Sequence, residues 1–185
     1  MSLKATSKTG KEFPLVPAGP HIARCIRVID LGTQDVIYKG QLKKTKQVRF
    51  SWELPNETTV FDEAKGPQPF SISKTFTNSI GTKSKLRPFA ETLMNRKLTE
   101  TEEKDGLDLN KFLGKCCQLS VIHEKDRKNP AITYANISAI MPLTKGTTVP
   151  PVVNELIEFE IGAANQDEVY AKLGAKLQEK IAKSE

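Results

Sequence analysis

The sequence lacks long apolar runs. No stretch approaches the roughly 20 apolar residues that a membrane-spanning helix needs. The first residues, MSLKATSKTGKEF, contain no apolar segment either, so we expect no secretory signal there. Together these absences predict a cytoplasmic protein without a membrane segment.

Cysteine and histidine are also scarce. The chain has three cysteines and two histidines, namely Cys25, Cys116, Cys117, His21 and His123. The cysteines show neither zinc nor redox spacing, which favours small buried or half-buried thiols in a reducing compartment. No H-E-x-x-H motif and no phosphate-loop spacing occurs. The acidic stretch 99–108 is more typical of a solvated, turn-like loop than of a metal-dependent nuclease. We therefore expect no enzyme activity, no metal and no cofactor.

The remaining composition is that of a folded domain with a basic surface. Of 185 residues, 38% are hydrophobic and 27% charged, and the formal net charge is +6. We expect three parts: an N-terminal arm or lead-in strand over 1–19, a main domain over 20–146, and an extension over 147–185. The extension is predicted to be an extended segment followed by an amphipathic helix. Its apolar stripe, which would dock on the domain or bind a partner, is Val169, Leu173, Leu177 and Ile181.

The stretch from Ile22 to Leu54 is predicted to be a strand, a long basic loop and a second strand. The second strand alternates cleanly. Its apolar parity favours the core over base stacking and comprises Val48, Phe50, Trp52 and Leu54. Arg49 lies on the opposite parity and is the better candidate for a ligand contact.

A third strand, FSISKTFT, places Lys74 among Phe70, Ile72 and Phe76 on one parity. That face is either core or an exposed basic and aromatic platform. A helix is expected from about Leu86, followed by the acidic stretch and a short helical turn, LNKFLG. Two further strands, CCQLSVIHE and ITYANISAIMPL, flank a second basic loop, KDRKNP.

The element order is therefore three strands, a helix and two strands. This is the order of the OB-fold, a five-stranded barrel that binds oligonucleotides through strands two and three and through loops 1–2 and 4–5. Both of those loops are basic in this chain. The expected fold class is thus mainly β with α: a five-stranded OB-fold barrel with a C-terminal extension and helix.

Several segments resemble a known family. The runs FPLVPAGPHIARCIRVIDLGTQ, QVRFSWELP, LNKFLGKCCQLSVIHE and YANISAIMPLTKG resemble bacteriophage OB-fold single-stranded DNA-binding proteins. The resemblance covers roughly residues 13–146 and also the LQEKI of the C-terminal helix. It implies a protein that coats single-stranded DNA during phage replication and recombination, in the cytoplasm of a bacterial host. Phage replication or recombination proteins are candidate partners, with the C-terminal helix as the candidate docking site. The acidic tail of the bacterial single-strand binders is missing, because this chain ends in KIAKSE.

Charge and parity predict the contact residues. Basic side chains would neutralise phosphates and exposed aromatic rings would stack on bases, without sequence preference. The candidates are Tyr38, Lys39, Lys43, Lys44, Lys46, Arg49, Lys74, Phe76, Lys125, Arg127, Lys128 and Tyr134. Two alternatives stay open: a protein–protein adaptor of a recombination complex, and an RNA-binding OB protein. The chain could also form oligomers.

Overall fold

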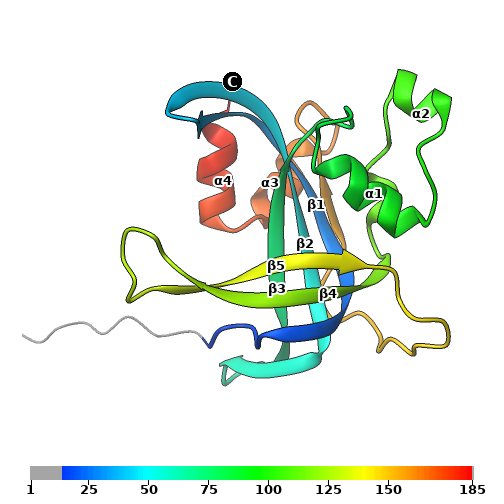
Figure 1. Ribbon diagram of the computed structural model, residues 1–185. Helices are drawn as coiled ribbons and strands as arrows, with labels where there is room; N and C mark the ends of the chain where they lie inside the picture. The colour runs from blue at the N-terminus through cyan, green and yellow to red at the C-terminus, as the bar shows by residue number, and fades with distance from the viewer. Residues whose placement is uncertain (1–13, 185) are drawn as a thin grey trace, which may run out of the picture.

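An antiparallel sheet, strongly curled into a half-barrel, dominates the computed structural model, which describes residues 14–184 (Figure 1). The predicted arm therefore lies outside the described residues up to position 13. The five main strands are β1 (Gly19–Tyr38), β2 (Gln41–Asp62), β3 (Gly66–Thr77), β4 (Cys116–Lys125) and β5 (Thr133–Met141). The prediction of a mainly β protein is confirmed, as is the predicted order of strands and first helix.

The strands follow one another across the sheet in the order β3-β2-β1-β4-β5. β1 pairs with β2 along most of its length and with β4 through its first six residues. The curl of the sheet brings the two end strands, β3 and β5, to face one another. The ammonium of Lys74 on β3 donates a hydrogen bond to the Ile137 carbonyl on β5, at 2.8 Å. A side chain thus bridges the seam between these two strands.

The core lies inside the curl and is built on the apolar parity of β2. Phe50 and Trp52 are completely buried, and their rings stack with centroids 5.9 Å apart. Helix α1 (Leu86–Met94) adds Phe89, whose ring centre lies 5.0 Å from that of Phe50. The predicted core role of this parity is confirmed. Helix α1 is amphipathic, and Leu86 and Ala90 are buried in the same core.

The predicted long loop between the first two strands is wrong. β1 and β2 continue as a two-stranded ribbon that turns at Lys39 and Gly40, with φ angles of 51° and 77°. Two consecutive positive φ angles are typical of the tight type I′ hairpin turn. The ribbon was not predicted because its tip is exposed on both faces. Its sequence therefore shows no alternation of apolar and polar residues.

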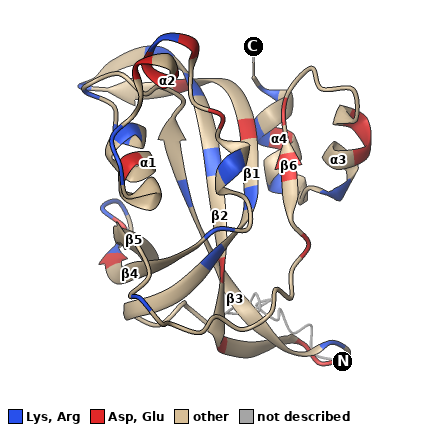
Figure 2. Cartoon of the chain, turned by 90° about the vertical axis from the view of Figure 1, so that its right-hand side faces the viewer, with Lys and Arg blue, Asp and Glu red and all other residues tan. Residues whose placement is uncertain are grey.

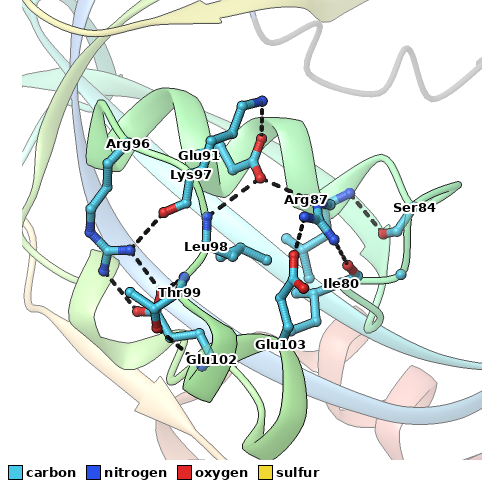
Figure 3. Close-up of polar contacts among 12 residues, drawn as sticks. Ile80, Ser84, Arg87, Glu91, Arg96, Lys97, Leu98, Thr99, Glu102 and Glu103 are labelled. Carbon is cyan, nitrogen blue, oxygen red and sulfur yellow. Dashed lines mark hydrogen bonds and ion pairs between the residues drawn. The ribbon is translucent and has the colours of Figure 1, made fainter.

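The acidic stretch after α1 contains a helix, α2 (Glu100–Asp105), where a turn-like loop was expected; its red acidic segments stand out in Figure 2. A capping box begins it: the Thr99 hydroxyl accepts from the Glu102 N–H at 3.2 Å, and the Glu102 carboxylate accepts from the Thr99 N–H at 3.0 Å. Figure 3 shows this pair among the ion pairs that join α2 to α1. The helical turn predicted next is the 3₁₀ helix η1 (Asn110–Phe112).

The extension folds back over the outside of the sheet. Strand β6 (Ile157–Phe159) pairs in parallel with β1, and two helices follow, α3 (Gln166–Lys172) and α4 (Ala175–Ala182). A single helix was expected, but the backbone is extended at Leu173 and Gly174, which separates the two helices. The predicted stripe packs inside the chain: buried Leu173 and Ile181 form a second apolar cluster with Ile29, Leu31, Ile157 and Phe159.

The thiols agree with their prediction. Cys25 and Cys117 are buried and Cys116 is half-buried, and burial raises the pKa of the first two thiols to about 12. Over the range 14–184, no helix has both the length and the apolar character needed to cross a membrane.

Candidate nucleic-acid interface

Strand β2 presents two faces with different surroundings. Its even-numbered residues from Val48 onward point into the barrel, whereas its odd-numbered residues lie on the outside. Because the strand pairs continuously with β1 up to the tip of the ribbon, Lys43 and Arg49 share the outer face. Lys44 and Lys46 lie on the other face. The structure therefore divides the predicted lysines into two sets.

Lys44 and Lys46 face acidic side chains of β1. The Lys46 ammonium lies 3.7 Å from the Asp30 carboxylate, and Lys44 is directly opposite Asp35. These carboxylates partly cancel the positive potential of that face. The inner side of the ribbon is thus less suited to phosphate than the outer side.

The tip of the ribbon combines an exposed ring with cations. Tyr38 is 55% exposed, and the ammonium of Lys43 lies 5.1 Å from its ring centre. Lys39, in the turn, lies 5.6 Å from the same centre. These distances are typical of cation–π contacts, which hold the ring among positive charges.

The β4–β5 hairpin carries the second basic cluster, at the same side of the barrel as the ribbon tip in Figure 1. The Asp126 carboxylate accepts hydrogen bonds from the N–H groups of Lys128 and Asn129, at 2.7 and 2.8 Å, and so shapes the loop. The predicted cations Lys125, Arg127 and Lys128 are exposed on this hairpin. Tyr134, on β5, is 47% exposed.

A groove on the outer face brings Arg49 and Tyr134 together. Ser71 and Ser73 on β3 and Leu15 also line it, together with apolar residues that include Phe70 and Ile72. We call this the outer groove. Burial, and next the charge of Arg27, lower the pKa of Arg49. An arginine in this setting remains charged, because its ordinary pKa lies far above neutrality. The groove thus brings together a cation of β2, two serines of β3 and an aromatic residue of β5.

The expectation that Phe76 is exposed is wrong. Phe76 is only 6% exposed and stacks on Phe89, with ring centres 4.9 Å apart. Lys74 lies on the same inner parity. Its ammonium donates a hydrogen bond to the Ile137 carbonyl of β5, and burial lowers its pKa. Phe76 therefore belongs to the core and Lys74 bridges β3 and β5. Neither residue lines the outer groove.

Two cations of this region, Arg27 on β1 and Lys180 on α4, were not predicted from the sequence. Bulges after Cys25 and after Asp30 interrupt the alternation of β1. The face of the sheet on which Arg27 lies could therefore not be predicted from the sequence pattern. Lys180 lies far away in the sequence and is brought in by the docking of α4. Ser71 and Ser73 share the polar parity of β3, and this pattern could have predicted that they line the groove.

No cluster of three or more histidine, cysteine or acidic side chains suited to a metal ion occurs among residues 14–184. Comparison of the chain with protein-family models, with curated proteins and with solved structures finds no match in any of the three.

Proposed function

We propose that the curled sheet is an OB-fold. Its strand order, β3-β2-β1-β4-β5 with β3 and β5 facing each other, is that of the partly open five-stranded barrel. The position of α1, between β3 and β4, is in accord with it. In that fold the outer face of the second and third strands binds oligonucleotides, and here this face bears the outer groove.

The function that fits this surface best is sequence-independent binding of single-stranded DNA. One observation carries the proposal: the outer groove is lined by Arg49 of β2 and Tyr134 of β5, and each of these strands runs into one of the two basic hairpins. Cations on such a surface neutralise phosphates and release counterions, and exposed rings stack on unpaired bases. The mechanism involves binding alone, with no covalent step. The resemblance to phage single-stranded DNA-binding proteins is in accord with a role in coating DNA during replication and recombination.

The proposal is tested by fluorescence anisotropy of labelled oligo-dT and of a matched duplex, at several salt concentrations. The single strand should bind more tightly than the duplex, because a duplex hides its base faces. Affinity should fall as salt rises, with a slope of about 0.7 per phosphate contact. Absence of binding to oligo-dT at low salt would contradict the proposal.

Variants locate the binding surface. Tyr134→Ala should weaken oligo-dT binding by about 1–3 kcal/mol, the usual contribution of one stacked base, whereas Tyr134→Phe keeps the ring and should bind normally. Lys43→Gln should weaken binding and reduce the salt slope by about 0.7. Lys65→Gln removes the same charge from the exposed β2–β3 turn and should change neither quantity. Equal effects of the two lysine variants would contradict the assignment of the outer face.

A protein–protein adaptor remains the second candidate, because the ribbon also exposes apolar side chains. Ile37 and Leu42 are 75% and 67% exposed on its inner side. An adaptor would retain partner binding in the Lys43→Gln and Tyr134→Ala variants. Competition between oligo-dT and oligo-U separates the DNA function from an RNA-binding one.

A further inference from the structure

Three cations from distant parts of the chain lie near one another, and one of them, Arg49, lines the outer groove. In the β1–β2 register, Ile29 is opposite Arg49 and Arg27 is opposite Ser51, so both arginines lie on one face at neighbouring positions. The charge of Arg27 contributes to the lowered pKa of Arg49. The charge of Arg49 in turn contributes, after burial, to the lowered pKa of Lys180. We call these three residues the cation cluster.

Lys180 is held at the cluster by the docking of α4 beside the ribbon (Figure 1). The amide of Gln34 donates to the Lys180 carbonyl at 2.9 Å and to the Leu31 carbonyl at 2.6 Å. The next residue, Ile181, is buried in the apolar cluster that contains Ile29, and Ile29 is directly opposite Arg49 in the β1–β2 register. The position of Lys180 is therefore a property of the folded chain and not of a free tail.

No carboxylate within residues 14–184 forms an ion pair with a member of the cation cluster. Glu53 lies on the same face of β2 as Arg49, but it is already bonded to Val153 and Asn154. Among the described atoms, Arg27 Nε is buried without a hydrogen-bond partner, and so are Thr45 Oγ1 and Gln47 Oε1. Half-buried like charges repel one another and lose hydration, so a cluster without a counter-charge destabilises the unliganded fold.

We propose that Arg27, Arg49 and Lys180 form a phosphate-binding site, in which α4 supplies one of the cations. Guanidinium groups bind phosphate oxygens through paired, charge-assisted hydrogen bonds, and an ammonium adds a further donor. All three side chains are only partly buried, and Arg49 also lines the open groove. The site therefore continues the outer groove toward the C-terminal helix. The identification of the ligand as a phosphodiester of a single strand rests on the function proposed above.

The test compares Lys180→Gln with Lys176→Gln, which removes the same charge from an exposed position of the same helix. In anisotropy titrations with oligo-dT, Lys180→Gln should weaken binding roughly tenfold at low salt, as expected for a lost charged hydrogen bond. It should also reduce the salt slope by about 0.7. Lys176→Gln should match the wild type in both.

A second measurement needs no nucleic acid. Inorganic phosphate should raise the thermal unfolding midpoint of the wild type and of Lys176→Gln more than it raises that of Lys180→Gln, at matched ionic strength. Without phosphate and at low salt, Lys180→Gln should unfold at or above the wild-type midpoint, because it relieves repulsion. That result excludes a folding defect as the cause of weaker binding.

The outcomes separate the two proposals. If the wild type binds oligo-dT and Lys180→Gln binds it equally well with the same salt slope, the cation cluster is not a phosphate site and the proposed function stands. If oligo-dT does not bind, but phosphate stabilises the wild type and not Lys180→Gln, the site serves a free phosphate group and the proposed function fails. If neither ligand distinguishes the variants, the inference is overturned.

Discussion

Gly32 lies where β1 closely approaches the residues that follow α4. It lies at a bulge of β1, with a φ of 66°, and its N–H donates to the Asp30 carboxylate at 2.9 Å. A Cβ atom at this position would lie 2.6 Å from the Cβ of Ser184 and 2.9 Å from Ile161. Two requirements therefore favour glycine here: the positive φ angle, and the lack of space for a Cβ atom beside Ser184 and Ile161.

We expect Gly32→Ala to destabilise the protein by about 2–4 kcal/mol, combining left-handed backbone strain with overpacking. Gly146→Ala is the matched control, because Gly146 has a φ of 87° and no atom within 4 Å of the added carbon. The control should cost about 1 kcal/mol. Urea denaturation measures both free energies of unfolding, and equal losses would show that the contact with Ser184 does not matter.

At the scale of elements, a network of ion pairs joins α1 to α2 where the sequence indicated only a solvated acidic turn. Both terminal nitrogens of Arg96 donate to the Glu102 carboxylate, at 2.7 and 2.8 Å, and Lys111 donates to it at 3.1 Å. Arg87 contacts Glu91 and Glu103 beside it (Figure 3). Arg96, the Thr99 N–H and Lys111 hold the pKa of Glu102 well below its ordinary value of 4.5.

This depressed pKa predicts a pH dependence of stability. A carboxyl group whose pKa is lower in the folded state stabilises the fold above its unfolded pKa, and the contribution is lost as pH falls further. The thermal midpoint of wild type should therefore exceed that of Glu102→Gln at pH 7. The difference should shrink as the pH falls below 4.5.

Glu100→Gln, at an exposed position of the same helical turn, should show a smaller loss at pH 7. If the difference between wild type and Glu102→Gln were the same at pH 7 and at pH 3, Glu102 would not be held ionised by this network.

At the scale of the whole molecule, the segment after β5 is fastened to the barrel by a buried carboxylate. Glu53 is completely buried on the outer parity of β2. It accepts hydrogen bonds from the N–H groups of Val153 and Asn154, at 3.3 and 3.0 Å, and from the Asn154 amide at 3.0 Å. Arg24 lies 3.6 Å away and supplies the counter-charge. This anchor precedes β6 and the two C-terminal helices, so it fixes the path by which they reach β1.

Glu53→Ala should destabilise the protein by about 3–5 kcal/mol, because it leaves the Arg24 charge buried without its partner. Urea denaturation measures the loss, and limited proteolysis should cut near Val153 before the barrel is digested. Glu63→Ala, in the exposed β2–β3 turn, is the control and should change little. Intact proteolytic resistance of Glu53→Ala near Val153 would show that β6 and α4 hold the segment by themselves.

The sequence by itself determined the strand order, the core parity of β2 and the charge of the two hairpins. Each depends on a local pattern: Phe50 and Trp52 alternate with polar residues, and α1 repeats its apolar positions at helical spacing. It also located Tyr38, Arg49 and Tyr134, which the structure leaves at least partly accessible on the outer side.

Only the tertiary structure decided how the outer parity of β2 is used. The strand pattern predicts that Arg49, Ser51 and Glu53 all face the solvent. Glu53 is instead buried beneath Val153 and Asn154, and Arg49 lies near Lys180. Alternation tells which residues share a face but not what covers that face. The cover here comes from residues about a hundred positions away, and its contacts exist only once the chain has folded.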